Sequence, residues 1–173
     1  MKGSGITLKI NDVKSKIMLD QFLIDANVKS VGAMDTGLNN EAYSYLTITD
    51  AVSTPWYQIN PIKMLDFAEG YLKMSEVLLV YPVDPEAQER IQLMPHSECI
   101  VFYLERFAVK ANLSMGADML LSGVLDSLDK RFLTITDATV FPMFPARAKL
   151  PQNIPIALLN RAKISHYHAV PCD

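Results

Sequence analysis

The sequence predicts a mostly β protein in which one β-rich unit occurs as two tandem copies formed by internal duplication. The first observation is an identity: Leu46–Ala51 and Leu133–Ala138 both read Leu-Thr-Ile-Thr-Asp-Ala. The second is a looser match between Ile17–Val28 and Phe102–Leu113, which share a Leu-acid-x-Phe core and an Ala-Asn-apolar ending. The third is the alternation of apolar and polar residues inside the six-residue repeat, which is typical of half-buried strands. A self-match at a nearly fixed offset indicates that the repeated unit is a structural unit.

The composition predicts a folded cytoplasmic protein. Half of the residues are hydrophobic and a fifth are charged, which favours a buried core over disorder. The net charge of −3 argues against bulk electrostatic binding to nucleic acid, although a local basic patch is compatible with it. Cys99 and Cys172 are far apart, so free thiols in a reducing compartment are expected, with Cys99 buried. The sequence contains neither an apolar run of bilayer length nor a signal peptide, so no membrane association is predicted.

The pattern predicts a short strand at Ile6–Ile10 and long strands at Ile17–Val28 and Phe102–Leu113. The following piece, Met119–Leu128, is compatible with a bent strand or a short helix. Its leucines and valine fit one helical face, whereas its glycine is typical of a bend in a strand. A bent strand is favoured, with Met34–Leu38 as its counterpart in the first copy.

The repeated strand carries an acidic residue where its alternation requires an apolar one. Asp50 and Asp137 both share the parity of the leucine and isoleucine that precede them. Because a buried unpaired carboxylate is costly, this predicts a bulge, a strand end or a turn. The carboxylate is expected to accept hydrogen bonds from backbone N–H groups there.

Proline-rich stretches follow both repeats and predict connecting loops, at Pro55–Pro61 and Pro142–Pro155. Final strands are expected at Met74–Tyr81 and Ala162–Tyr167. After the first of these, Asp84 and Pro85 suit the N-cap and first position of a short helical turn.

The domain boundary is expected at this helical turn. It divides the chain into a first copy at 1–83 and a second copy at 84–173. One continuous β-sandwich made from both copies is the alternative architecture.

The order of these elements resembles the Sm-like superfamily, and the resemblance implies that the two copies are tandem Sm-like small β-barrels. The residues that carry the resemblance in the second copy are Gly123-Val124-Leu125, Leu133–Ala138 and Leu159–Ile164, and in the first copy Gly37, Leu46–Ala51 and Lys73–Val77. The resemblance implies that edge strands pair between neighbouring modules to close a ring. Two modules per chain would then make a trimer a pseudo-hexameric ring, which is favoured over two swapped chains or a monomer. Nine methionines also suit an adaptable interface.

The resemblance also implies where single-stranded RNA would bind, at two loops around the centre of the ring. The chain departs from the family there: Phe132 and Tyr45 stand at the family's Asn position, Asn160 and Lys73 stand at its closing Arg position, and the following Gly is missing. The aromatic rings either stack on a base or belong to the core, and the cations either hold phosphates or form a solvated rim. The candidate residues are Lys130, Arg131, Phe132, Asn160, Arg161, Lys163, Tyr45 and Lys73.

Two functions are therefore expected: an RNA-binding module in a ring-like oligomer, or a non-enzymatic structural or regulatory protein-interaction module that has lost the RNA site. The sequence contains none of the nucleophile-elbow, Walker, dinucleotide-binding or His-Glu-x-x-His motifs, so no enzyme and no cofactor are predicted. His166 and His168 share one face of a strand but are too few to predict a metal site.

Overall fold

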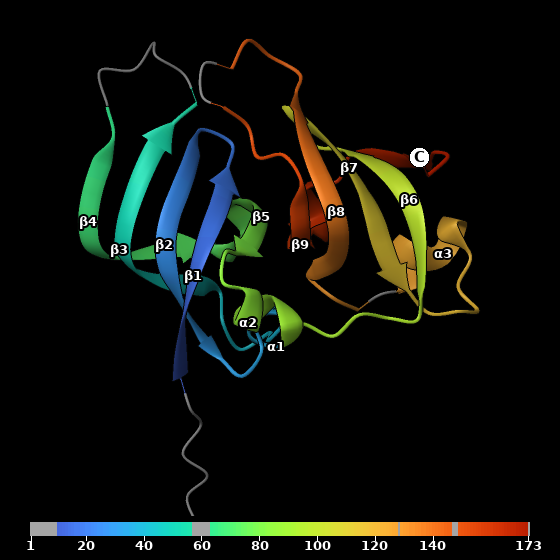
Figure 1. Cartoon of the computed structure of the whole chain (residues 1–173), viewed down its shortest axis with the longest axis horizontal. Helices are drawn as coiled ribbons and strands as arrows, with labels where there is room; N and C mark the ends of the chain where they lie inside the picture. The colour runs from blue at the N-terminus through green and yellow to red at the C-terminus, as the bar shows by residue number, and fades with distance from the viewer. Residues whose placement is uncertain (1–9, 57–62, 128, 147–148, 173) are drawn as a thin grey trace, which may run out of the picture.

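The computed structural model describes residues 10–56, 63–127, 129–146 and 149–172. These residues form one ten-stranded antiparallel sheet with short helices at its connections, which confirms the mostly β prediction (Figure 1). The elements in chain order are β1 (Ile10–Leu19), β2 (Phe22–Val31), α1 (Met34–Leu38), β3 (Tyr45–Pro55), β4 (Leu65–Lys73), η1 (Met74–Glu76), β5 (Val77–Pro82), α2 (Pro85–Glu89), β6 (His96–Tyr103), β7 (Phe107–Met115), α3 (Leu121–Ser127), β8 (Phe132–Pro142), β9 (Ile154–Asn160), η2 (Arg161–Lys163) and β10 (His166–Ala169).

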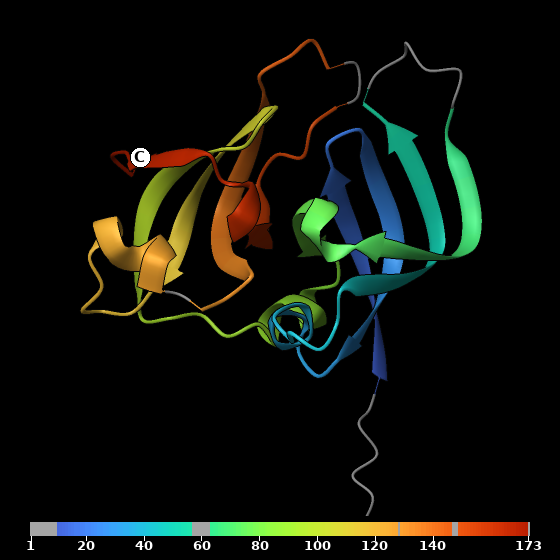
Figure 2. The same cartoon turned by 180° about the vertical axis from the view of Figure 1, so that it is seen from behind.

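The strand order is β10-β6-β7-β8-β9-β5-β1-β2-β3-β4. In the first half, β5 returns to pair with β1, and in the second half β10 returns to pair with β6 in the same way. The two halves meet where β9 pairs with β5. The remaining edges are β4 at one side of the molecule and β10 near the C-terminal end at the other (Figures 1 and 2).

Each half has an apolar core, and each core includes side chains of the other half. Ile156 and Leu158 of β9 pack in the core of the first half. In return, Trp56 and Leu79 of the first half pack in the core of the second. The ring of Trp56 lies 5.6 Å from that of Phe107, and its Nε1 donates to the carbonyl of Leu19 at 2.9 Å. The two halves are therefore joined by burial as well as by strand pairing.

The acidic residue of each repeat lies at a bulge, as predicted. Asp50 and Asp137 have φ of 49° and 52°, a left-handed conformation that Asp tolerates better than most residues. The register shifts at both places. The donor differs from the prediction: the Nδ2 of Asn27 reaches Asp50 at 3.1 Å, and that of Asn112 reaches Asp137 at 3.0 Å. Side-chain amides thus satisfy carboxylates that the bulge turns away from the core.

The two long strands expected from the sequence are hairpins. The stretch Ile17–Val28 is not one strand, because β1 ends at Leu19 and β2 begins at Phe22; its counterpart Phe102–Leu113 breaks between Tyr103 and Phe107 in the same manner. The shared Leu-acid-x-Phe core is thus a hairpin connection. The strands β3 and β8 end at Pro55 and Pro142, as the proline-rich stretches predicted, but Pro155 lies inside β9 and the strands β4 and β9 were not expected. Pro155 fits in β9 because it lies across from the bulge at Asp137, between the pairs Thr136–Ile156 and Ala138–Ile154.

The pieces expected as bent strands are helices, α1 and α3. Leu121 and Leu125, which share a face of α3, pack against the core of the second half, so burial favours the helix. The closing strands begin later than expected, because η1 and η2 precede β5 and β10. The helical turn at Pro85 is present as α2.

The expected strand at Ile6–Ile10 lies outside the described residues except for Ile10, which opens β1. None of the helices in the described part of the chain has the length and apolar character needed to cross a bilayer.

Candidate functional site

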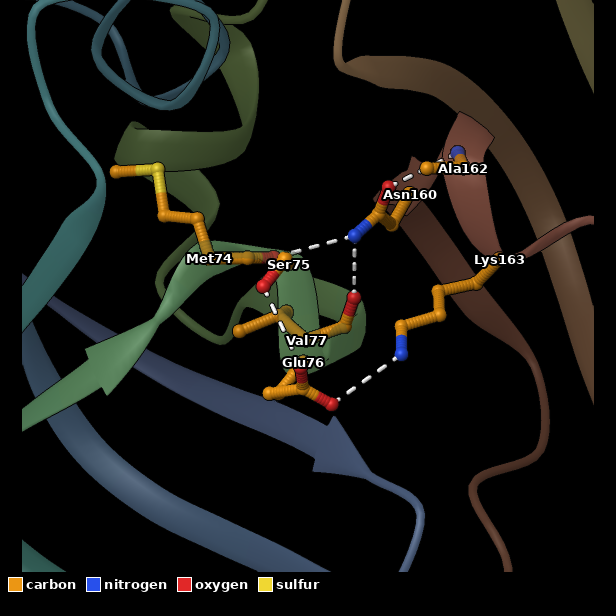
Figure 3. Close-up of polar contacts among 7 residues, drawn as sticks. All are labelled: Met74, Ser75, Glu76, Val77, Asn160, Ala162 and Lys163. Carbon is orange, nitrogen blue, oxygen red and sulfur yellow. Dashed lines mark hydrogen bonds and ion pairs between the residues drawn. The ribbon is translucent and has the colours of Figure 1, made fainter.

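Most of the sequence-predicted site residues gather where the two halves meet. Lys130 and Arg131 precede β8, and Asn160, Arg161 and Lys163 lie at the end of β9 and in η2. The turn η2 lies next to η1 of the first half (Figure 3). Tyr45 and Lys73 lie opposite one another on β3 and β4. We call the contact of β9 and η2 with η1 and β5 the internal junction.

Asn160 is a structural residue of the internal junction. Its side chain is fully buried, and its Nδ2 donates to the carbonyl of Met74 at 3.1 Å and to that of Val77 at 2.8 Å (Figure 3). Its Oδ1 accepts from the N–H of Ala162 at 3.0 Å. The amide thus provides hydrogen-bond partners for backbone groups in the turns of both halves. Buried backbone groups at a chain reversal require such partners. It is unavailable for a nucleotide in this arrangement.

An ion pair lies beside this amide. Lys163 Nζ is 3.3 Å from Glu76 Oε2, and both side chains are partly exposed (Figure 3). The hydrogen bond from Lys163 and then its charge lower the pKa of Glu76. Lys163 therefore already has an anionic partner within the chain, so a phosphate would compete with Glu76 for it.

Phe132 does not offer a surface to a base. Its ring is fully buried in the core of the first half. Its backbone is held by one side chain of the first half: Asn39 Oδ1 accepts from the N–H of Phe132 at 2.8 Å, and Asn39 Nδ2 donates to its carbonyl at 3.1 Å. The proposed stacking by Phe132 was thus wrong, and the core alternative is correct.

The two arginines hold backbone segments together. Arg131 Nη1 donates to the carbonyl of Tyr43 at 2.8 Å and lies 2.9 Å from Met74 Sδ. Arg161 Nη1 donates to the carbonyl of Leu125 at 3.0 Å, which ties η2 to α3. Each guanidinium group carries five N–H groups in a planar fork.

Two openings border the internal junction and share Arg131 and Ala162. One has a volume of about 310 Å³ and is lined by Asn39, Glu41, Asp129, Lys130, Arg131, Arg161 and Ala162. The other has about 250 Å³ and is lined by Ser44, Lys73, Met74, Ser75, Arg131, Asn160 and Ala162. Four cations therefore lie around them, opposed by two acidic residues. This set could hold an anion through charge and bidentate hydrogen bonds.

Tyr45 does not line either of these openings. It is exposed, and it lines a largely apolar cavity of about 190 Å³ together with Tyr43, Leu46 and Met74. The sequence-predicted site is therefore divided: six residues lie at the internal junction or line its openings, Phe132 is buried in the core of the first half, and Tyr45 lines a different cavity.

The histidines of β10 stack on a neighbouring ring. His166 lies 4.2 Å from Tyr103 between ring centroids and is nearly parallel to it, and His168 lies at 5.7 Å. Within the described ranges, no group of three His, Cys, Asp or Glu side chains is placed to hold a metal ion. Cys99 is buried, as expected.

Sequence reasoning missed Asn39 and Met74. Asn39 contacts Phe132 from 93 positions away, and Met74 contacts Asn160 from 86 positions away. Local periodicity contains no signal for such pairs. The duplication offered an indirect signal, because Met74 and Arg161 occupy matching positions after their strands. Comparisons with protein-family models, curated proteins and solved structures found no match.

Proposed function

We propose that this chain is a non-enzymatic interaction module, built from two Sm-like barrels, that assembles with its own copies into a ring. The observation that carries the proposal is the internal junction. There the fourth strand of the second half, β9, pairs with the fifth strand of the first half, β5. The edges left over are the fourth strand of the first half, β4, and the fifth strand of the second half, β10. The same kind of pairing can therefore continue from chain to chain.

The exposed edge strand β4 supports the proposal that chains pair through their edges. An edge strand presents unpaired backbone groups, and natural proteins cover, charge or shorten such edges. On β4, Leu65 is 50% exposed and Tyr71 is 65% exposed, so large apolar side chains lie on an uncovered edge. A second copy would cover them. A head-to-tail contact of this type gives a ring when the rotation closes.

We expect three copies in the ring, so that six barrels surround its centre. Light scattering at micromolar concentration should give a mass near three times 19.3 kDa. The variant Tyr71→Asp should reduce the mass to that of a single chain, because a carboxylate would have to be desolvated at the covered edge. Leu120→Asp is the matched control, since Leu120 is also exposed but lies next to α3 rather than on an edge. A wild-type mass of 19.3 kDa would refute self-assembly.

RNA binding is a second candidate, favoured by the four cations around the openings at the internal junction. Titration of labelled oligo-U and oligo-A at low salt tests it. Binding should weaken with salt at a log–log slope of roughly −0.7 per neutralised phosphate, and Lys130→Ala should reduce that slope by about this amount. Lys63→Ala, which changes an exposed lysine away from the openings, should leave it unchanged. If neither oligonucleotide binds at roughly tens of micromolar, the range of ordinary non-specific binding, RNA binding is excluded.

A further inference from the structure

We infer that the contact between chains repeats the internal junction in one fixed register, with Tyr71 of one copy opposite Tyr167 of the next and Leu72 opposite His166. Lys73 would take the place of Asn160, and Glu76 would again face Lys163. This inference rests on the proposed self-assembly and goes beyond it, because it names the surface, the register and the pairs.

The twin repeats show which residues of β4 correspond to the residues of β9 at the internal junction. Leu46 pairs with Leu72, and its counterpart in the repeat, Leu133, pairs with Leu159. Leu72 therefore corresponds to Leu159, and Tyr71 corresponds to the preceding Leu158.

The residues of β10 that correspond to those of β5 follow from the pairing of β5 with β1 and of β10 with β6. Ile17 pairs with Val80, and Phe102, its counterpart, pairs with Tyr167. Tyr167 therefore corresponds to Val80, and His166 corresponds to Leu79. At the internal junction, Leu158 lies opposite Val80 and Leu159 opposite Leu79. Transferring these pairs gives the register stated above.

Burial agrees with this transfer. Leu72 is partly buried against the core of its own half, and its counterpart Leu159 is fully buried in the core of its own half. Tyr71 is mostly exposed, whereas its counterpart Leu158 is fully buried in the core of the half across the junction. Tyr71 thus has the position of a side chain that enters the neighbouring core. In the neighbouring chain, Tyr167 packs against the second-half core, which is the core that Tyr71 would enter.

The charges are complementary in the same register. Glu76 ends η1 and Lys163 ends η2, so the two residues hold matching positions in the two halves. At the internal junction Lys163 comes from the side of β9 and Glu76 from the side of β5. Between chains the sides are exchanged, and Glu76 meets the neighbour's Lys163. Opposite charges would therefore alternate around the ring, which disfavours a contact of two first halves or two second halves.

Lys73 can replace most of what Asn160 does. The carbonyl of Met74 accepts a hydrogen bond from Asn160 and another from the N–H of Val77 at the end of η1. The carbonyl of Arg161 accepts in the same way from the N–H of Ile164 at the end of η2. The carbonyls of Arg161 and Ile164 in the next chain are thus the counterparts of the two that Asn160 holds. An ammonium group has three donors for them but no acceptor, so the bond that Asn160 accepts from Ala162 has no equivalent. The contact between chains is therefore the weaker junction.

Disulfide trapping tests the register. The variant carries Tyr71→Cys and Tyr167→Cys, with the exposed Cys172 changed to Ser. Directly opposed residues of antiparallel strands have Cα atoms about 4.5–5.5 Å apart, which suits a disulfide. Mild oxidation should give covalent dimers and trimers on non-reducing gels. The control pairs Tyr167→Cys with Leu65→Cys, which is exposed on β4 but far along the strand, and should give few.

Lys73 provides a second measurement that leaves the tyrosines intact. Lys73→Asn should keep or tighten assembly, because it restores the internal arrangement, whereas Lys73→Ala should weaken the association of chains roughly tenfold. If trimers form but Leu65 crosslinks as well as Tyr71, or Lys73→Asn and Lys73→Ala weaken assembly equally, the register is wrong and the proposed function stands. If the wild type is monomeric, both fail.

Discussion

Replacing Phe132 by Ala should lower the free energy of unfolding by about 4 kcal/mol, within the range for removing a buried aromatic ring from a well-packed core. Phe132 is fully buried in the first-half core although it opens the first strand after α3 in the second half. The lost ring would leave a cavity at the boundary between the halves. A loss of this size is a large fraction of the stability of a typical domain.

Urea unfolding followed by circular dichroism measures this effect. Phe141→Ala is the matched control: Phe141 lies on the same strand but is about half exposed, so its loss should cost about 1 kcal/mol or less. A base-stacking role predicts the reverse, with unchanged stability and weaker RNA binding. An unfolding free energy within about 1 kcal/mol of wild type for Phe132→Ala would contradict the core assignment.

The parts of the fold that the sequence predicted are those that local pattern determines. The twin repeats form β3 and β8, and the aspartate out of phase in each repeat does lie at a bulge. The turn after Leu19 was missed because apolar residues on both sides of it continue without a Gly or Pro to mark it. A bent strand was favoured over the helix α3 because the leucines and valine there fit both periodicities. The helix α1 was missed because Met34–Leu38 lacks an apolar stripe.

The other failures arose from contacts between the halves. Pro155 was read as a sign of a loop, yet it lies across from a bulge that only strand pairing creates. Phe132 and Asn160 were candidates for an RNA site, with core packing as the alternative for Phe132. Both are buried because the other half covers them, and no local pattern contains that information. The sequence thus indicated the region around Phe132 and Asn160, but not that the two halves of the chain bury these residues between them.

Replacing Asn160 by Ala should cost about 3 kcal/mol of unfolding free energy. The substitution removes both hydrogen bonds to the carbonyls of Met74 and Val77 and leaves these acceptors without their side-chain donor in a buried site. Asn160→Asp should cost at least as much, since the carboxylate has the same shape but offers oxygen atoms to the two carbonyls. Asn11→Ala is the control, because its exposed amide makes one long hydrogen bond to Gly32 and its loss should stay within about 0.5 kcal/mol.

The form of the unfolding curve carries further information. Leu158 lies in the core of the first half and Leu79 in that of the second, so neither half can unfold without exposing apolar surface of the other. We therefore expect Asn160→Ala to shift one cooperative transition to lower urea rather than to split it in two. A split transition would mean that the amide alone joins the halves, and a shift below about 1 kcal/mol would mean that it does not join them.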